Sequence, residues 1–135
     1  MNGSSSRISL IAGVLAVVLS FAIFGNGIGG DFVFDDTLVI VGNPLIGHGI
    51  PDVLTIFSSP YHFQQPRTGL YRPLTILSFA FNWFLFGASP ASFHVVNILL
   101  YALAVWLLFL LARSWVDDWT AGVAALLFLV LPIHV

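Results

Sequence analysis

The chain has 135 residues, of which 59% are hydrophobic and only 7% charged, and it contains neither Lys nor Glu. A soluble domain carries about 25% charged residues, so this composition cannot cover a water-facing surface and indicates an integral membrane protein. The net charge of −2 is too small to indicate a nucleic-acid partner, and the absence of Cys excludes disulfides and thiolate metal sites.

The first predicted element is an apolar helix after a polar leader that ends at Arg7. Residues 8–24 carry no charge and would form roughly 26 Å of helix, which a glycine-rich stretch extends to about residue 28. A cleaved signal peptide is the alternative, because one Arg before an apolar run fits that too. The run exceeds the usual apolar region of about 7–15 residues in a signal peptide, so we favour an uncleaved span over residues 8–28.

Residues 30–92 are predicted to form a long loop that carries short helices. Pro51 suits the first turn of a helix, where its missing N–H has no partner. A short helix from Pro51 to about Ser58 is therefore expected, with an apolar face suited to the bilayer surface. Residues 73–86 are too few for an ordinary span, so they fit a juxtamembrane or re-entrant helix better than a tilted span.

Two further apolar runs, residues 93–112 and 120–135, are predicted to be the second and third spans. Asn97 in the second span is expected to bond to a neighbouring helix. The third run reaches the last residue without a polar flank, so we expect the N-terminal piece of a longer protein, inactive by itself. The predicted class is all-α integral membrane, with two to three transmembrane helices plus short juxtamembrane helices.

The arginines predict an orientation. Arg7 and Arg113 lie close enough to span ends to count as cytoplasmic under the positive-inside rule, which places the loop over residues 30–92 outside. The membrane would be the bacterial inner membrane, or the endoplasmic reticulum in a eukaryote. Four polar candidates would then lie at the external face: Asp35, Asp36, Arg72 and His134.

An acidic pair, Asp35 and Asp36, stands about ten residues beyond the first apolar run. A carboxylate at the bilayer centre costs about 2.5–3.5 kcal/mol, so the pair should lie at or beyond the interface. Adjacent carboxylates suit two tasks. One can remove a proton from an attacking hydroxyl while the other tunes it, or both can hold a divalent cation such as Mg or Mn. The dipeptide alone favours a plainer interpretation, solvated loop residues that cap the start of a helix.

Arg72 follows about 36 positions later, immediately before Pro73. Its guanidinium carries five donors in a rigid fork and pairs bidentately with phosphate. Taken alone, Arg72 is better explained as an interfacial anchor to lipid head groups. An acidic pair and an Arg near the mouth of a span together indicate chemistry on a lipid-linked phosphate at a membrane surface.

These motifs, in this order and spacing, resemble the GT-C membrane glycosyltransferases, and among them the transmembrane, tetratricopeptide-repeat O-mannosyltransferases and their bacterial relatives. The resemblance covers nearly the whole chain and rests on FVFDD at 32–36, NP at 43–44, YRPLT at 71–75, FGASP at 86–90, FHVVN at 93–97 and LPIH at 131–134. The acidic pair is Asp-Asp rather than the Asp-Glu of some branches, and the basic residue is Arg rather than Lys, so the charges are kept.

The resemblance implies transfer of a sugar, with mannose the first candidate, from a polyprenyl-phosphate donor to a hydroxyl of an acceptor protein or glycan. It implies Asp35 as the catalytic base and Asp36 as the second member of the pair, with a divalent cation between them in some branches. Arg72 and Tyr71 would lie near the donor phosphate. His134 would contact substrate from the third span. Membrane lipids would surround the spans.

A non-enzymatic membrane component, such as a transporter subunit or an assembly factor, is the competing class. Its loop would bind a partner, and its aspartates would be ordinary surface groups. The rest of the reading frame separates the two classes. Many further apolar spans, with helical repeats of about 34 residues after them, would support the transferase.

Overall fold

The computed structural model describes residues 3–64 and 69–131, and every regular element within these ranges is a helix. The predicted all-α class is therefore confirmed for the described part of the chain. Two helical segments, Ser5–Gly29 and Pro90–Ala112, are long and apolar enough to cross a membrane. The chain divides into two compact units, a three-helix unit (Met1–Gly27 with Val95–Val135) and a loop unit (Ile28–His94).

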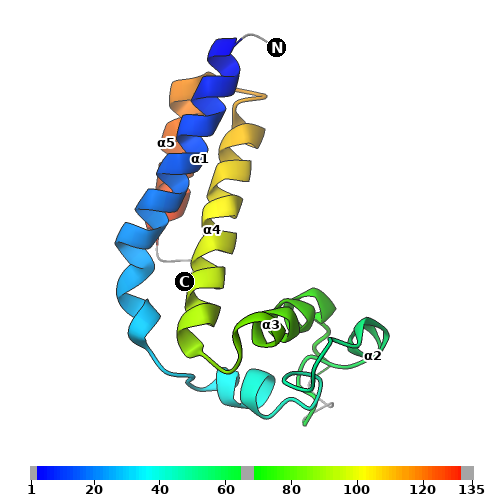
Figure 1. The fold of residues 1–135 in the computed structure, drawn as a ribbon. Helices are drawn as coiled ribbons and strands as arrows, with labels where there is room; N and C mark the ends of the chain where they lie inside the picture. Colours follow the sequence, from blue (N-terminus) through cyan, green and yellow to red (C-terminus); the bar gives the residue numbers. More distant parts are fainter. Residues whose placement is uncertain (1–2, 65–68, 132–135) are drawn as a thin grey trace. The chain divides into compact units, whose positions relative to one another are not determined.

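Three helices form the first unit, and each begins before the start of the corresponding predicted span (Figure 1). Helix α1 (Gly3–Phe24) begins inside the polar leader and continues as the 3-10 helix η1 (Gly25–Gly29). Helix α4 (Pro90–Ala112) begins three residues earlier than predicted, because Pro suits the first turn of a helix. Helix α5 (Asp118–Val130) also begins early, and the end of the predicted third span lies outside the described residues.

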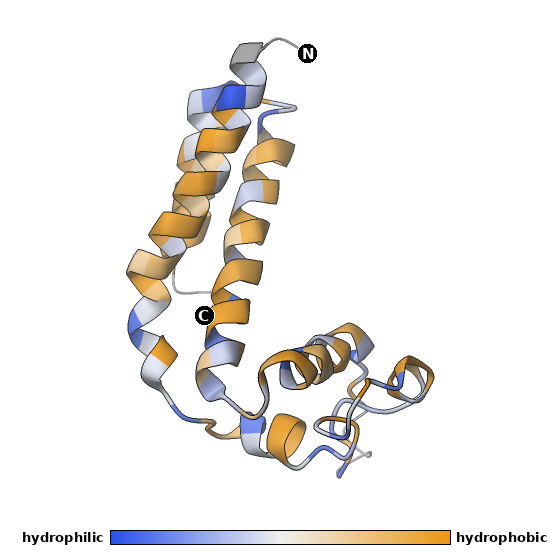
Figure 2. Cartoon of the chain, viewed as in Figure 1, coloured by the Kyte–Doolittle hydropathy of each residue, from blue (hydrophilic) through white to orange (hydrophobic). Residues whose placement is uncertain are grey.

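Small residues let these helices approach closely. The buried core of the unit consists of Ala16, Val105, Phe109, Ala121, Ala125 and Leu129. Gly13 on α1 faces the indole of Trp106, and a Cβ at that position would lie 3.2 Å from the indole nitrogen. Figure 2 shows the same three helices as apolar along most of their length. The packing depends on side chains small enough to admit a neighbouring helix.

Two aromatic residues of α4 donate hydrogen bonds to the neighbouring helices α1 and α5. The indole N–H of Trp106 donates to the carbonyl of Ser9 on α1 at 2.9 Å. The hydroxyl of Tyr101 donates to the carbonyl of Phe128 on α5 at 2.8 Å. Asn97 is exposed and bonds no other described residue, so its expected bond to a neighbouring helix stays a prediction.

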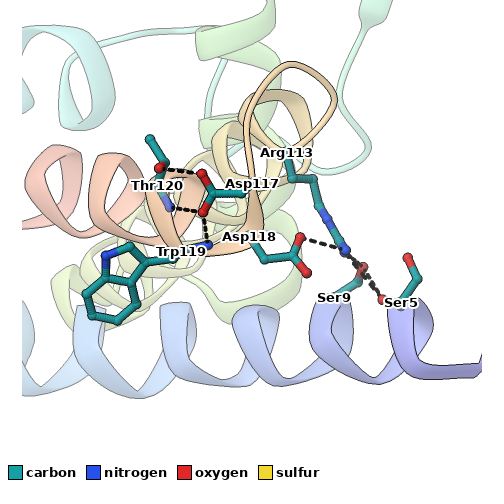
Figure 3. Close-up of polar contacts among 7 residues, drawn as sticks. All are labelled: Ser5, Ser9, Arg113, Asp117, Asp118, Trp119 and Thr120. Carbon is teal, nitrogen blue, oxygen red and sulfur yellow. Dashed lines mark hydrogen bonds and ion pairs between the residues drawn. The ribbon is translucent and has the colours of Figure 1, made fainter.

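Arg113 joins all three helices of the unit at one end (Figure 3). It follows α4 directly, and its guanidinium donates to the hydroxyl of Ser9 at 2.7 Å and to the carbonyl of Ser5 at 3.3 Å. Its other terminal nitrogen pairs with Asp118 of α5 at 2.8 Å. The first turns of α1 therefore lie beside the last turn of α4, and the two helices run antiparallel.

The start of α5 is fixed by Asp117, which stands at its N-cap (Figure 3). The carboxylate accepts the backbone N–H groups of Trp119 and Thr120, both at 3.0 Å, and the hydroxyl of Thr120 at 2.7 Å. Hydrogen bonds to the charged form favour it, so the Thr120 hydroxyl and then its backbone N–H lower the pKa of Asp117. The cap satisfies donors that a helix start would otherwise leave unpaired.

The loop unit is built from three short helices around its own apolar core. They are the π-helix η2 (Thr37–Val41), α2 (Val53–Phe57) and α3 (Pro73–Phe86). The core consists of Val39, Ile40, Ile46, Ile56, Ile76, Ala80 and Phe93. The predicted loop is thus a compact body with a buried centre.

Helix α3 has the bounds predicted from the sequence. Pro73 occupies its first turn, and Gly87, with φ 72°, ends it in a conformation that favours glycine. Of the polar residues on this helix, Asn82 is 4% exposed and faces the start of α4. Its amide donates to the Ser92 carbonyl at 3.2 Å, and its oxygen accepts the Ser92 hydroxyl at 2.8 Å. These two bonds fasten α3 to the segment that follows it.

Helix α2 is shorter than predicted and starts later. Asp52, not Pro51, begins it: the carboxylate accepts the Thr55 N–H at 3.2 Å and the Thr55 hydroxyl at 2.6 Å. Pro51 is buried just outside the helix. Placing Pro51 in the first turn was wrong because a capping Asp at the next position provides the stronger start. Ile56 of α2 is buried in the core of the loop unit.

Candidate active site

The acidic pair lies in a tight turn that precedes η2. Phe34, just before the pair, has φ 47°, a left-handed conformation that is costly for a bulky side chain. The turn is held by the Asp36 N–H, which donates to the Val33 carbonyl at 3.0 Å, and by the Thr37 hydroxyl, which donates to the Phe34 carbonyl at 2.7 Å. Backbone strain of this kind persists only where surrounding bonds impose it, and such positions cluster at functional sites.

The two carboxylates have different surroundings. Asp36 is half-buried, and one of its oxygens accepts the Val33 N–H at 3.3 Å. Asp36 occupies the position before η2, as a capping residue would, although its side chain makes no capping bond to that helix. Asp35 is exposed, and its carboxylate accepts no hydrogen bond from a described residue. Of the two, Asp35 has the carboxylate available to an incoming hydroxyl.

Arg72 stands immediately before α3, and its side chain is exposed. Its carbonyl accepts the Ile76 N–H at 3.2 Å, the first hydrogen bond of the helix, so the backbone of Arg72 is fixed. The guanidinium carbon lies 5.1 Å from the ring centroid of Tyr61. This is within the distance of a cation–π interaction. No ion pair joins Arg72 to either member of the acidic pair, although all three residues are described.

The pKa of Tyr61 depends on the charges of three predicted site residues, Arg72, Asp35 and Asp36. Burial raises the pKa of Tyr61, and the positive charge of Arg72 lowers it. The negative charges of Asp35 and then Asp36 raise this pKa further. One phenol is therefore within electrostatic range of carboxylates and a guanidinium that are far apart in the sequence.

Tyr61 itself is well anchored. Its backbone N–H donates to the Leu70 carbonyl at 2.9 Å, which brings the residue beside the segment that leads into α3. Its ring packs against the core of the loop unit, as does that of Phe32, three residues before the acidic pair. The same core thus supports both sides of the candidate site.

The remaining predicted site residues have other placements. The Tyr71 hydroxyl donates to the Phe57 carbonyl at 2.6 Å, so its proton is engaged within the loop unit and its role at a donor phosphate stays a prediction. His134 lies outside the described residues. The apolar cavity of about 410 Å³ between α1, α4 and α5 is lined by Leu15, Phe109, Leu126 and similar residues, and contains none of the predicted site residues.

Sequence reasoning did not identify Tyr61. It follows Pro60 in a stretch with no helical or strand pattern, and nothing in its spacing from Arg72 predicts a contact. The pairing of residues 61 and 70 across the intervening loop creates that contact. Only the folded arrangement reveals it.

The described residues form an all-helical fold with two helices of membrane-crossing length and a compact loop unit that carries the acidic pair and Arg72. Comparison with known proteins then gives the relationship. Over 91% of this chain and 14% of the relative, it is 36% identical to protein O-mannosyl-transferase TMTC1 of Mus musculus. It is 30% identical to TMTC3 of Homo sapiens over 98% of the chain, and 32% identical to Tmtc1 of Drosophila melanogaster over 86%.

The chain is therefore homologous to a segment of the protein O-mannosyl-transferases, and the resemblance to that family is confirmed. It spans about one seventh of the length of these relatives, each of which carries the same printed activity in its name. No family model matches the chain, and no solved structure matches it.

Proposed function

We propose that this chain is part of an integral, multi-pass membrane glycosyltransferase, which transfers a mannosyl group from a polyprenyl-phosphate donor to a hydroxyl of an acceptor protein. The observation that carries the proposal is the similarity, over 91% of the chain, to a protein named for O-mannosyl transfer. A transporter subunit or assembly factor is not favoured by that similarity. The relatives are several times longer, so the activity is proposed for the whole protein and not for this chain alone.

The helix arrangement supports a membrane orientation with the loop unit outside. Arg113 bonds Ser5, so the start of α1 and the end of α4 share one end of the three-helix unit. Near the other end Phe24 and Tyr101 meet edge to face at 5.3 Å. Arg7 and Arg113 then lie at the same end, which the positive-inside rule assigns to the cytoplasm. The chain enters and leaves the loop unit from the opposite end, on the external side.

The proposed reaction uses Asp35 as a base. Its carboxylate takes the proton of the acceptor hydroxyl as the hydroxyl oxygen attacks the anomeric carbon of the donor. The bond from that carbon to the phosphate oxygen breaks, and the electron pair leaves on the lipid phosphate. Arg72 stabilises the charge that the phosphate gains. Asp36, whose carboxylate bonds the backbone of its own turn, holds the turn that presents Asp35.

The acidic pair fits a divalent cation only in part. The described residues contain no group of three or more His, Cys, Asp or Glu side chains that could hold a metal ion. One oxygen of Asp36 also accepts the Val33 N–H. No step of the proposed reaction is assigned to a metal, and the cation suggested by the adjacent carboxylates stays a prediction.

The test is Asp35→Asn in the whole protein, assayed in membranes for transfer of radiolabelled mannose from a polyprenyl-phosphate donor. Because the amide cannot accept the proton, transfer should fall by at least about 100-fold, the lower range of general-base contributions. Asp31→Asn is the matched control: it is an exposed Asp of the same segment, with no assigned role, and should retain full activity.

Membrane insertion should be equal in both variants, as measured by protease protection of the loop. Full transfer by Asp35→Asn with normal insertion would contradict the assignment of the base. Equal loss in Asp35→Asn and Asp31→Asn would show that the segment tolerates no change, and would likewise remove the specific role of Asp35.

A further inference from the structure

The guanidinium of Arg72 at the proposed site is not paired with a carboxylate of any described residue. Arg72 and the acidic pair all lie within electrostatic range of the Tyr61 phenol, and Arg72 forms no ion pair with Asp35 or Asp36. An ion pair would occupy both the base and the phosphate-binding cation. The contact that the Arg72 side chain does make is with Tyr61.

The side chain of Tyr61 contacts Arg72 in two ways. The guanidinium carbon of Arg72 lies 5.1 Å from the ring centroid, within cation–π distance, and a hydrogen bond from Arg72 to the phenol opposes the rise that burial causes in the pKa of Tyr61. The ring cannot swing away easily, because it packs on the core of the loop unit and its backbone is bonded to Leu70. By contrast, the side chain of Arg72 is exposed, and its backbone is held in place at the start of α3.

We propose that Tyr61 is a positioning residue, which holds the guanidinium of Arg72 beside its ring, so that Arg72 is presented to a phosphate of the lipid-linked donor. This inference rests on the proposed function and deepens it. A guanidinium has five N–H donors in one plane, so a contact with a single tyrosine leaves donors for an anion. Tyr61 acts through Arg72 and does not itself touch the reacting atoms.

The test separates the ring from the hydroxyl. Tyr61→Leu removes the aromatic face and should raise the KM for the polyprenyl-phosphate donor by about tenfold, within the range for a partly desolvated cation–π contact. Tyr61→Phe retains the face and should bring the KM back to within about threefold of the wild type. Phe63→Leu is the matched control, because Phe63 is an exposed aromatic residue of the same segment. Its KM should equal that of the wild type.

A double variant distinguishes positioning from general damage. If Tyr61 acts through Arg72, then Tyr61→Leu should have no further effect in a protein that already carries Arg72→Ala. Independent structural damage would instead multiply the two losses. Binding of a polyprenyl monophosphate to the protein in nanodiscs, measured without turnover, should weaken in Tyr61→Leu and recover in Tyr61→Phe.

The outcomes separate this inference from the proposed function. Normal donor KM and normal polyprenyl-monophosphate binding in Tyr61→Leu would overturn the positioning role, even if Asp35→Asn is inactive. Multiplying losses in the double variant would overturn it too. Full activity of Asp35→Asn would instead overturn the proposed mechanism, whatever Tyr61 does to the binding of the lipid phosphate.

Discussion

The junction between α3 and α4 offers a quantitative test of the loop unit. Asn82, 4% exposed, makes two hydrogen bonds to Ser92, one through its amide and one through its oxygen. Each such bond contributes about 0.5–1.5 kcal/mol net. Asn82→Ala should therefore lower the free energy of opening at this junction by roughly 1–3 kcal/mol. The Ser92 hydroxyl keeps its second acceptor, the Ser89 carbonyl at 2.8 Å, so no larger penalty is expected.

Hydrogen–deuterium exchange of the complete chain in detergent micelles measures this opening directly. Protection of amides around the end of α3 and the start of α4 should fall by roughly 5- to 150-fold, since each 1.4 kcal/mol is a factor of ten. Ser78→Ala is the matched control on the same helix. Its hydroxyl bonds the Thr75 carbonyl one turn away at 2.8 Å, so its loss touches no other element.

A double-variant cycle assigns the effect to the pair. In the presence of Ser92→Ala, Asn82→Ala should cost less, because the hydroxyl bond is already absent, with a coupling of about 0.5–1.5 kcal/mol. An Asn82→Ala effect on protection no larger than that of Ser78→Ala would show that the two bonds do not hold this junction. Additive effects of Asn82→Ala and Ser92→Ala, without coupling, would show the same.

Two further predictions concern the three-helix unit. Gly13→Val places atoms against the indole of Trp106, where even a Cβ would lie at 3.2 Å, and should lower thermal stability in micelles by about 1–3 kcal/mol. Gly122→Ala, where a Cβ meets nothing within 4 Å, should cost nothing, and equal effects of the two would contradict this packing. The depressed pKa of Asp117 adds stability above its ordinary value of 3.8, and this is lost as the pH falls through the lowered pKa. Thr120→Val should move that pKa upward in a carbon-13 NMR titration, and an unmoved pKa would show that the hydroxyl is not its main cause.

The helix over residues 73–86 was predicted with the bounds that the structure shows for α3. The structure gives the physical reason, because Pro73 lies in its first turn and Gly87 follows its last residue. The helix after Pro51 was misplaced because two start signals compete there, and the side chain of Asp52 provides the stronger one. The π-helix η2 was not predicted, since no residue type marks a helix of that kind.

Contacts between segments that are distant along the chain could not be predicted from the sequence. An apolar helix shows its hydrophobicity but not which side faces its neighbours, so the hydrogen bonds from Trp106 to α1 and from Tyr101 to α5 were not predicted. The acidic pair and Arg72 could be named as candidates from their types and order. Tyr61 could not, because its meeting with Arg72 depends on how the chain pairs across an irregular loop.

The bond between Arg113 and Ser5 also sets an order of events during synthesis. Its two ends are separated by 108 positions, and the ion pair with Asp118 closes later still. At about 5–20 residues per second, the ribosome needs roughly 5–20 s after making Ser5 before the guanidinium exists. During that interval the first turn of α1 lacks its guanidinium partner, so nascent chains halted before residue 113 should expose that turn to crosslinking by the insertion machinery.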